Sequence, residues 1–171
     1  MLIYKDIVTG DEMFTDIYKI KETEDGFFIE VEGAMVTRSG GDISESLIGG
    51  NKSAEEQVED FDKVTESGVD IVLNSKLQET ILNKKSFKVY IKEYVKELTA
   101  KLKETKPERV EPFMKEIGDK VRDILVNIKN YQFFTGDSMN PAGMLGMLDF
   151  REDGVTPFMI FFKDGLEVEK V

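Results

Sequence analysis

The sequence predicts an α+β fold in which one antiparallel helical hairpin interrupts a series of short β-strands. Long helical periodicity occurs only between Lys84 and Asn130. Before and after that span, apolar and polar residues alternate over short stretches that end in glycine-containing turns. Apolar residues three and four positions apart indicate an amphipathic helix, whereas alternation indicates a strand with one wet face. The two patterns divide the chain into strands, a helical pair, and strands again.

The segment before the helices is expected to form short antiparallel strands. In the clearest of them, Phe27 begins a row of alternate apolar residues, and Phe28 begins a row with two glutamates on the other face. This alternation predicts a β-hairpin with one wet face, whose first strand covers 18–22. Val69 to Leu73 is apolar and β-branched, which predicts a buried strand. Further strands are expected at 2–4 and 13–16, with an extension at 34–37.

A different composition marks the segment from about 39 to 66. It contains two Gly pairs, many serines, and eight acidic residues against two lysines. Its apolar residues are too sparse to offset the entropy that would be lost on ordering. We therefore expect a long flexible acidic loop within a single domain that spans residues 1–171.

The hairpin prediction rests on two apolar faces. The face of the first helix repeats at helical spacing and consists of Phe87, Ile91, Tyr94, Leu98 and Leu102. The face of the second helix is wider and consists of Val110, Phe113, Met114, Ile117, Val121, Ile124, Leu125 and Ile128. Each face is a stripe of the kind that a helix buries against a core. The helical hairpin is therefore expected to cover about 84–130.

The connection between the two helices is short, so the helices are expected to run antiparallel. Thr105 followed by Glu108 fits a capping box, and Pro107 suits a first helical turn, where its missing N–H costs nothing. Pro112 would remove an internal hydrogen bond from a helix that had already begun at Thr105. The regular second helix is therefore expected to begin between Glu108 and Glu111.

The C-terminal segment is expected to return to strands. These strands are predicted at 131–135, 144–150, 155–163 and 166–168. Short turns that contain glycine join the last three of them, which predicts a meander.

Charge is distributed unevenly along the chain. The formal net charge is −11, yet the segment from Lys84 to Lys106 holds eight lysines against three glutamates. General nucleic-acid binding is inconsistent with the overall negative charge, because phosphates would be repelled. Two interpretations fit the basic segment: a solvated helix face, or a contact surface for an acidic protein partner. The contact candidates on the first helix are Lys84, Lys85, Lys88, Lys92 and Lys96.

The absence of two residue types limits the chemistry. The sequence contains no Cys and no His, which excludes disulfides, thiol nucleophiles, triads with histidine, and Cys- or His-based zinc sites. We therefore expect neither an independent hydrolytic enzyme nor a zinc site. The charge at Lys5 argues against a signal peptide, and the longest nearly apolar run, 155–162, is shorter than the roughly 20 residues of a membrane helix. A cytosolic protein without membrane insertion is the simplest expectation.

An acidic cluster is the candidate for a metal site. Glu55, Glu56, Glu59 and Asp60 lie close together in the acidic loop, and carboxylate oxygens are the ligands that Ca²⁺ takes. No stretch has the residue spacing of an EF-hand, so any calcium site is expected to be weak. A solvated acidic loop is the alternative interpretation.

Two other motifs lack part of what their chemistry requires. The segment 47–53 is similar to a phosphate-binding loop, but Asn51 stands where a glycine must precede the lysine. Asp11 and Glu12 form a pair of carboxylates in a turn, which could serve acid–base chemistry or contact a partner. The sequence shows no group near them that would complete a catalytic site.

Extended stretches along the whole chain resemble the translationally controlled tumour protein family. They include Ile3 to Asp6, Ser46 to Asn51, Gly68 to Val72, Pro107 to Val110, Asn130 to Phe134, Met139 to Pro141 and Asp149 to Glu167. The resemblance implies a β-tent of twisted, mainly antiparallel sheets with a projecting α-helical hairpin and a long flexible acidic loop. It also implies a cytosolic protein that is not an enzyme.

The resemblance further implies partners. Family members are described as calcium-binding and microtubule-associated proteins with a role in growth and survival, and the helical hairpin is the segment tied to tubulin and calcium. Glu12 falls on the family acid that engages a Rheb-like small GTPase in nucleotide exchange. Ser46 falls on a position that a polo-like kinase phosphorylates. Val171 stands where animal members have Cys, so a disulfide-linked dimer cannot form through it and a monomer is expected.

Overall fold

The strands of the protein form antiparallel sheets in the computed structural model, which describes residues 1–39 and 65–171. A three-stranded sheet has the order β11-β1-β2, with strands Leu166–Lys170, Leu2–Asp6 and Glu12–Thr15. A six-stranded sheet has the order β3-β4-β10-β9-β8-β7. In that order its strands are Lys19–Glu22, Phe28–Glu32, Pro157–Phe162, Gly146–Phe150, Gln132–Thr135 and Gln78–Thr80. A two-stranded ribbon pairs β5 (Met35–Ser39) with β6 (Thr65–Val69).

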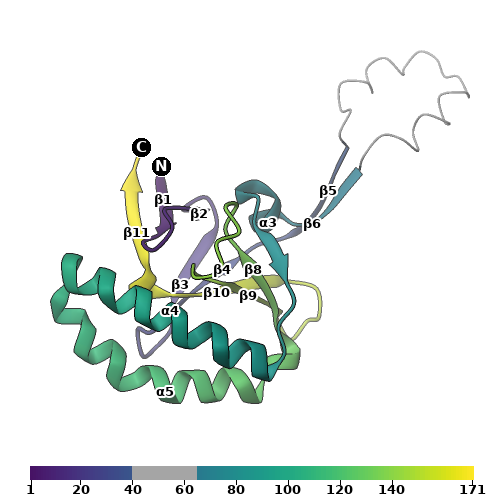
Figure 1. Cartoon of the computed structure of the whole chain (residues 1–171). Coiled ribbons are helices and arrows are strands. Elements are labelled where there is room, and N and C mark those ends of the chain that lie inside the picture. Colours follow the sequence, from purple (N-terminus) through teal and green to yellow (C-terminus); the bar gives the residue numbers. More distant parts are fainter. Residues whose placement is uncertain (40–64) are drawn as a thin grey trace, which may run out of the picture.

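Two long helices pack against each other, and one short helix contacts β2 and β6. They are α3 (Asp70–Ser75), α4 (Lys84–Thr105) and α5 (Val110–Val126), with 3₁₀ turns at Pro107–Arg109, Ile128–Asn130 and Lys163–Gly165. Figure 1 shows α4 and α5 side by side beneath the strands, while the ribbon β5–β6 points away from the body. The two termini emerge together, because the N–H of Val171 donates to the carbonyl of Met1. None of the helices described is long and apolar enough to cross a membrane.

The predicted apolar face of the first helix is confirmed. Its five residues are all buried in α4: Phe87, Ile91, Tyr94, Leu98 and Leu102. The ring of Tyr94 lies 5.7 Å from that of Phe162 in β10, which joins the helix to the six-stranded sheet. The preceding residue of β10, Phe161, points to the opposite face, and its ring lies 4.8 Å from that of Phe14 in β2. The core therefore has two halves, one under the helices and one between the two larger sheets.

The second helix differs from its predicted apolar face at one residue. Phe113, Ile117 and Ile124 are buried in α5 as expected, and Phe113 stacks on Phe27 with 5.4 Å between ring centroids. Met114, however, is 48% exposed, because it lies on the flank of the helix beside the buried row. Its assignment to the apolar face was therefore wrong.

The predicted capping box at Thr105 and Glu108 is also wrong. Helix α4 continues to Thr105, whose hydroxyl donates to the carbonyl of Lys101 at 2.9 Å inside that helix. Helix α5 instead begins at Val110, after a 3₁₀ turn that starts with Pro107. Pro112 falls in the first turn of α5, where its missing N–H has no helical partner to lose.

The capping box that does form lies at the start of α4. The side-chain oxygen of Asn83 accepts from the N–H of Ser86 at 2.8 Å, and the hydroxyl of Ser86 accepts from the N–H of Asn83 at 2.8 Å. These reciprocal bonds satisfy two backbone donors at the helix N-terminus and fix where α4 begins.

The buried strand predicted for Val69 to Leu73 is replaced by the end of β6 and the helix α3. A carboxylate oxygen of Asp70 accepts from the N–H groups of Ile71 and Ala34, both at 2.9 Å. Such a side-chain bond to the next backbone N–H competes with the strand ladder and starts a helical turn. The β-branched residues that follow therefore lie in a helix rather than a strand, and the side chain of Ile71 is fully buried in the core.

Two strand pairings depend on contacts between distant parts of the chain. Strands β9 and β10 form the predicted hairpin, but β11 leaves that sheet and pairs with β1, so the three-stranded meander is wrong at its last strand. The segment predicted as an extension at 34–37 instead belongs to β5, which pairs with β6. The acidic loop predicted at about 39–66 lies between these two strands and, apart from its ends, outside the described residues.

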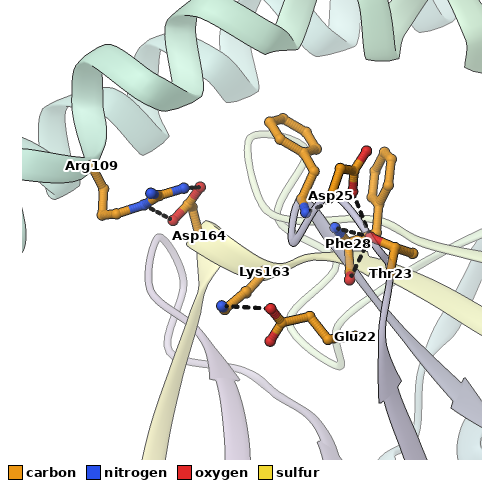
Figure 2. A network of polar contacts seen from close by, with 8 residues as sticks. Glu22, Thr23, Asp25, Phe28, Arg109, Lys163 and Asp164 are labelled. Atoms are coloured by element: carbon orange, nitrogen blue, oxygen red, sulfur yellow. Dashed lines mark hydrogen bonds and ion pairs between the residues drawn. The ribbon is translucent and has the colours of Figure 1, made fainter.

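Ion pairs fasten the hairpin to the sheets. Arg109 donates from Nε and Nη2 to the two carboxylate oxygens of Asp164, at 2.8 and 3.0 Å. Figure 2 shows this two-pronged contact reaching from the turn between the helices to the connection between β10 and β11. Close by, Lys163 donates to Glu22 at 3.1 Å. A second tie runs from Lys120 of α5 to Asp25 in the turn between β3 and β4.

The Asp25 contact is expected to make stability depend on pH. Its carboxylate accepts from Lys120, from the N–H of Phe27 at 3.0 Å and from the hydroxyl of Thr23 at 2.7 Å. These bonds, with that from Lys120 the largest cause, hold the pKa of Asp25 well below its ordinary value. A lowered folded-state pKa stabilises the protein above the unfolded pKa of about 3.9, and this stabilisation is lost as the pH falls through the folded value.

The variant Asp25→Asn is therefore expected to be less stable than wild type at pH 7, with a smaller difference at pH 3. Urea unfolding at the two pH values measures both differences. Asp119→Asn is the control, because Asp119 is exposed and, among the residues that the structure describes, pairs only with the exposed Arg122 on its own helix. An equal difference for Asp25→Asn at the two pH values would contradict the assigned role.

Candidate functional site

The five lysines predicted as contact residues share the outer side of α4. Four of them follow one another at every fourth residue, which places them along one ridge of a helix. The fifth lies beside the first, and all five are exposed: Lys84, Lys85, Lys88, Lys92 and Lys96. Within the part of the chain that the structure describes, none of these five side chains forms an ion pair. We call this group the lysine row.

The lysine row begins where positive charge is least favourable for the helix itself. Lys84 and Lys85 occupy the first turn of α4, and that turn contains no acidic residue. The N-terminus of a helix already carries partial positive charge, so two lysines there raise the local positive potential and cost stability. A local conflict of this kind is typical of functional surfaces, where stability gives way to binding.

Glu12 occupies the first position of β2 and is held against α3. One oxygen of its carboxylate accepts from the hydroxyl of Ser75 at 3.1 Å. Ser75 is the last residue of α3 and is only 8% exposed. Strand β2 is an edge strand of its sheet, so Glu12 combines a side chain bonded to α3 with a position at the sheet edge.

The turn that precedes Glu12 is fastened by carboxylates as well. Asp6 is buried and accepts from the N–H of Met144 at 2.7 Å, the N–H of Val8 at 2.9 Å and the hydroxyl of Thr9 at 3.0 Å. Burial raises the pKa of Asp6 above its ordinary value. Asp11 accepts from the hydroxyl of Ser138 at 2.6 Å. The turn is thus tied to the segment 136–144.

The paired carboxylates of the sequence do not act on one common atom. Asp11 bonds to Ser138, whereas Glu12 bonds to Ser75 on a different element. This arrangement fits a contact surface better than acid–base catalysis, which needs two groups directed at one substrate.

The other candidates lie outside the described residues. These are the phosphorylation candidate Ser46 and the calcium candidates Glu55, Glu56, Glu59 and Asp60. Among residues 1–39 and 65–171, no group of three or more acidic side chains is arranged to hold a metal ion.

Sequence reasoning did not find Ser75 as the partner of Glu12, nor Asp164 as the partner of Arg109. In each case the two residues are more than fifty positions apart, and the contact depends on how the sheets pair. No local spacing carries that information.

The match to a known family covers nearly the whole chain. The model of the translationally controlled tumour protein family matches residues 1–167. The chain belongs to that family. Homologues in the family include those of Danio rerio, 66% identical over 170 residues, and Xenopus tropicalis, 64% identical over 171 residues. In both cases the match covers 99% of this chain and 99% of the relative.

Solved structures of the family confirm the predicted α+β fold class. The translationally controlled tumour-associated protein of Schizosaccharomyces pombe is 45% identical, with a TM-score of 0.79 and 100% of both chains covered. The Caenorhabditis elegans protein is 28% identical, with a TM-score of 0.71 and coverage of 100% and 99%. Proteins of this family are not known as enzymes.

Proposed function

We propose that this protein binds acidic protein surfaces through the lysine row of α4, with tubulin on microtubules as the main partner. It acts as a cytosolic, non-enzymatic, calcium-binding protein with a role in growth and survival. The observation that carries the proposal is that five exposed lysines stand together without ion pairs among the described residues. Two of them lie at the helix end where they destabilise the helix.

The charge on the rest of the molecule supports a directed contact. The chain carries a net charge of −11, so an acidic partner is repelled by most of its surface and attracted by the lysine row. Complementary charge of this kind orients the encounter and raises the association rate more than it raises affinity. The contact is expected to weaken as salt shortens the Debye length from about 10 Å at 0.1 M.

Calcium binding belongs to the proposal through the acidic segment. Its candidate ligands, Glu55, Glu56, Glu59 and Asp60, are carboxylates, which suit Ca²⁺. These residues are close together in the sequence but lack EF-hand spacing. Sensor EF-hands bind Ca²⁺ with dissociation constants of roughly 10⁻⁷ to 10⁻⁵ M, and the expected affinity of this site is weaker than that.

Reversal of three lysines to glutamate at positions 88, 92 and 96 is expected to abolish co-sedimentation with microtubules at low salt. The reason is that the variant meets the acidic tubulin surface with negative charge. Pelleting assays with and without Ca²⁺ measure the effect and show whether calcium changes it.

A matched control reverses Lys19, Lys21 and Lys170, which are exposed on β3 and β11. This control has the same net charge as the test variant and is expected to pellet much more than the variant of α4. Equal pelleting of the α4 variant and wild type would contradict the proposal.

A second candidate function is regulation of nucleotide exchange on a Rheb-like small GTPase. The observation that favours it is the fixed carboxylate of Glu12 at the start of an edge strand. A carboxylate held in place can compete with phosphate oxygens for Mg²⁺, which would loosen a bound nucleotide.

Glu12→Val is expected to lower GTPase nucleotide release without unfolding the protein. Glu12→Gln tests the charge alone, because the amide oxygen of Gln can still accept a hydrogen bond from Ser75 while the negative charge is removed. Release of a fluorescent nucleotide from the GTPase measures the effect, and thermal melts check the fold. Release rates that are the same for wild type and both variants would remove this candidate.

A further inference from the structure

A cavity of about 400 Å³ opens beside α4, between this helix, the end of β7, the end of β8 and the segment 141–145. Its apolar lining consists of Leu82, Val89, Tyr90, Pro141, Ala142 and Leu145. The volume lies in the range of sites that bury small ligands or single side chains. The sequence pattern gave no sign of it, because its walls come from four separate segments of the chain.

The inner polar groups of the cavity are already bonded within the protein. The hydroxyl of Tyr90 donates to the carbonyl of Gly143 at 2.7 Å, and that of Thr135 donates to the carbonyl of Gly136 at 2.9 Å. The hydroxyl of Ser86 is part of the capping box with Asn83. With the hydroxyls of Tyr90, Thr135 and Ser86 already bonded, a guest that lies against them is favoured if it is apolar rather than polar.

The mouth of the cavity borders the lysine row. Val89 lines the cavity and is 68% exposed. On the helix surface its neighbours are Lys85, four residues before it, and Lys92, three residues after it. An apolar mouth and a row of positive charge thus share one edge of α4.

We propose that the cavity and the lysine row form one docking site for an acidic peptide segment that inserts a bulky apolar side chain. The inserted side chain occupies the cavity past Val89, while acidic residues of the same segment contact Lys85, Lys92 and Lys96. This inference rests on the proposed function, because it uses the same lysines. It adds a specificity element that charge alone lacks.

The chemistry of the site selects this occupant over others. A neutral apolar ligand would fill the cavity but leave the lysines without a counter-charge. A phosphate or nucleic acid would pair with the lysines but leave the apolar mouth exposed. Glu93 lies at the rim and repels an acidic residue placed over the cavity itself, so the acidic residues must lie on the lysine side.

The test uses a fluorescein-labelled synthetic peptide in which pairs of glutamates flank one phenylalanine, and a second peptide with alanine in its place. Fluorescence anisotropy at low salt gives both dissociation constants. The phenylalanine peptide is expected to bind about tenfold more tightly, as burial of one aromatic side chain predicts. Ala142→Phe, which fills the cavity, and Val89→Asn, which makes its mouth polar, are each expected to remove this advantage.

Val126→Asn is the matched control, because Val126 is 74% exposed on α5 and lines no part of the cavity. It should leave the tenfold preference intact. Equal binding of the two peptides to wild type would overturn the inference. In that case, if reversal of Lys88, Lys92 and Lys96 abolished the binding of both peptides, the proposed function would still be supported. Unchanged binding after that reversal would instead overturn the proposed function and the inference together.

Discussion

Arg109→Ala is expected to lower the free energy of unfolding by about 3 kcal/mol. The loss comes from Asp164, which is 7% exposed and bonds to Arg109 through both carboxylate oxygens. Removal of one member of a buried ion pair costs about 3–5 kcal/mol, because the remaining charge stays buried without a partner. The Arg109 side chain is 39% exposed, so water reaches part of the gap and places the effect at the lower end of that range.

Urea unfolding at pH 7 measures the effect, and two variants control it. Arg122→Ala removes an arginine of the same hairpin whose pair with Asp119 is exposed on both sides, and it is expected to cost less than about 0.5 kcal/mol. The double variant Arg109→Ala with Asp164→Leu is expected to regain part of the loss, because no buried charge remains. Equal costs for Arg109→Ala and Arg122→Ala would show that the hairpin is not fastened at this point.

Gly165→Ala is expected to lower the free energy of unfolding by about 2–3 kcal/mol. A Cβ atom at this position would overlap with the hydroxyl of Tyr94 and with the end of the Met144 side chain. Tyr94 is fully buried between α4 and β10, so its ring cannot move aside without disturbing the core. The carbonyl of Gly165 also accepts from the N–H of Ile7 at 3.0 Å, which limits any shift of the backbone.

A second substitution tests this explanation. Tyr94→Phe removes the overlapping hydroxyl, and the ring carbon behind it would lie 3.6 Å from the new Cβ, an ordinary contact. Among the described residues, the Tyr94 hydroxyl is buried without a hydrogen-bond partner, so its removal alone is expected to leave stability unchanged or higher. The double variant should recover part of the loss caused by Gly165→Ala, because only the overlap with the flexible end of the Met144 side chain then remains. Additive effects of the two changes, measured by urea unfolding, would contradict the proposed clash.

The local patterns of the sequence predict the helices and most strands. The face from Phe87 to Leu102 is predicted and observed residue by residue, because helical spacing depends only on neighbours within one turn. The alternating strand that begins at Phe27 is confirmed for the same reason: Phe27, Ile29 and Val31 are buried.

Errors occur where a distant contact overrides the local pattern. At the strand predicted for Val69 to Leu73, the carboxylate of Asp70 bonds to the N–H of Ile71, which starts a helical turn, and also to that of Ala34, thirty-six residues away. The meander fails because β11 pairs with the first strand of the chain. Neither partner could be inferred from composition or spacing within either segment.

Local sequence spacing likewise predicts one part of the candidate site and not the rest. The lysine row follows from the spacing of Lys88, Lys92 and Lys96 on one helix, so the sequence alone identifies it. The cavity beside it cannot be predicted in this way, because it forms only where α4, the ends of β7 and β8, and the segment 141–145 meet. Glu12 is identified as one of two carboxylates in a turn and, through the family resemblance, as a GTPase contact, but its bond to Ser75 depends on the packing of α3 on β2.

The most direct test of the central claim is to map the contact surface on the protein. We expect that titration of unlabelled microtubules into the ¹⁵N-labelled protein broadens backbone amide signals from Lys84 to Lys96, and that added salt reverses the broadening. Signals of β3 and β11, which carry Lys19, Lys21 and Lys170, should keep their intensity relative to the rest of the molecule. Broadening centred on those strands, with the signals of α4 unaffected, would contradict the assignment of the lysine row as the partner surface.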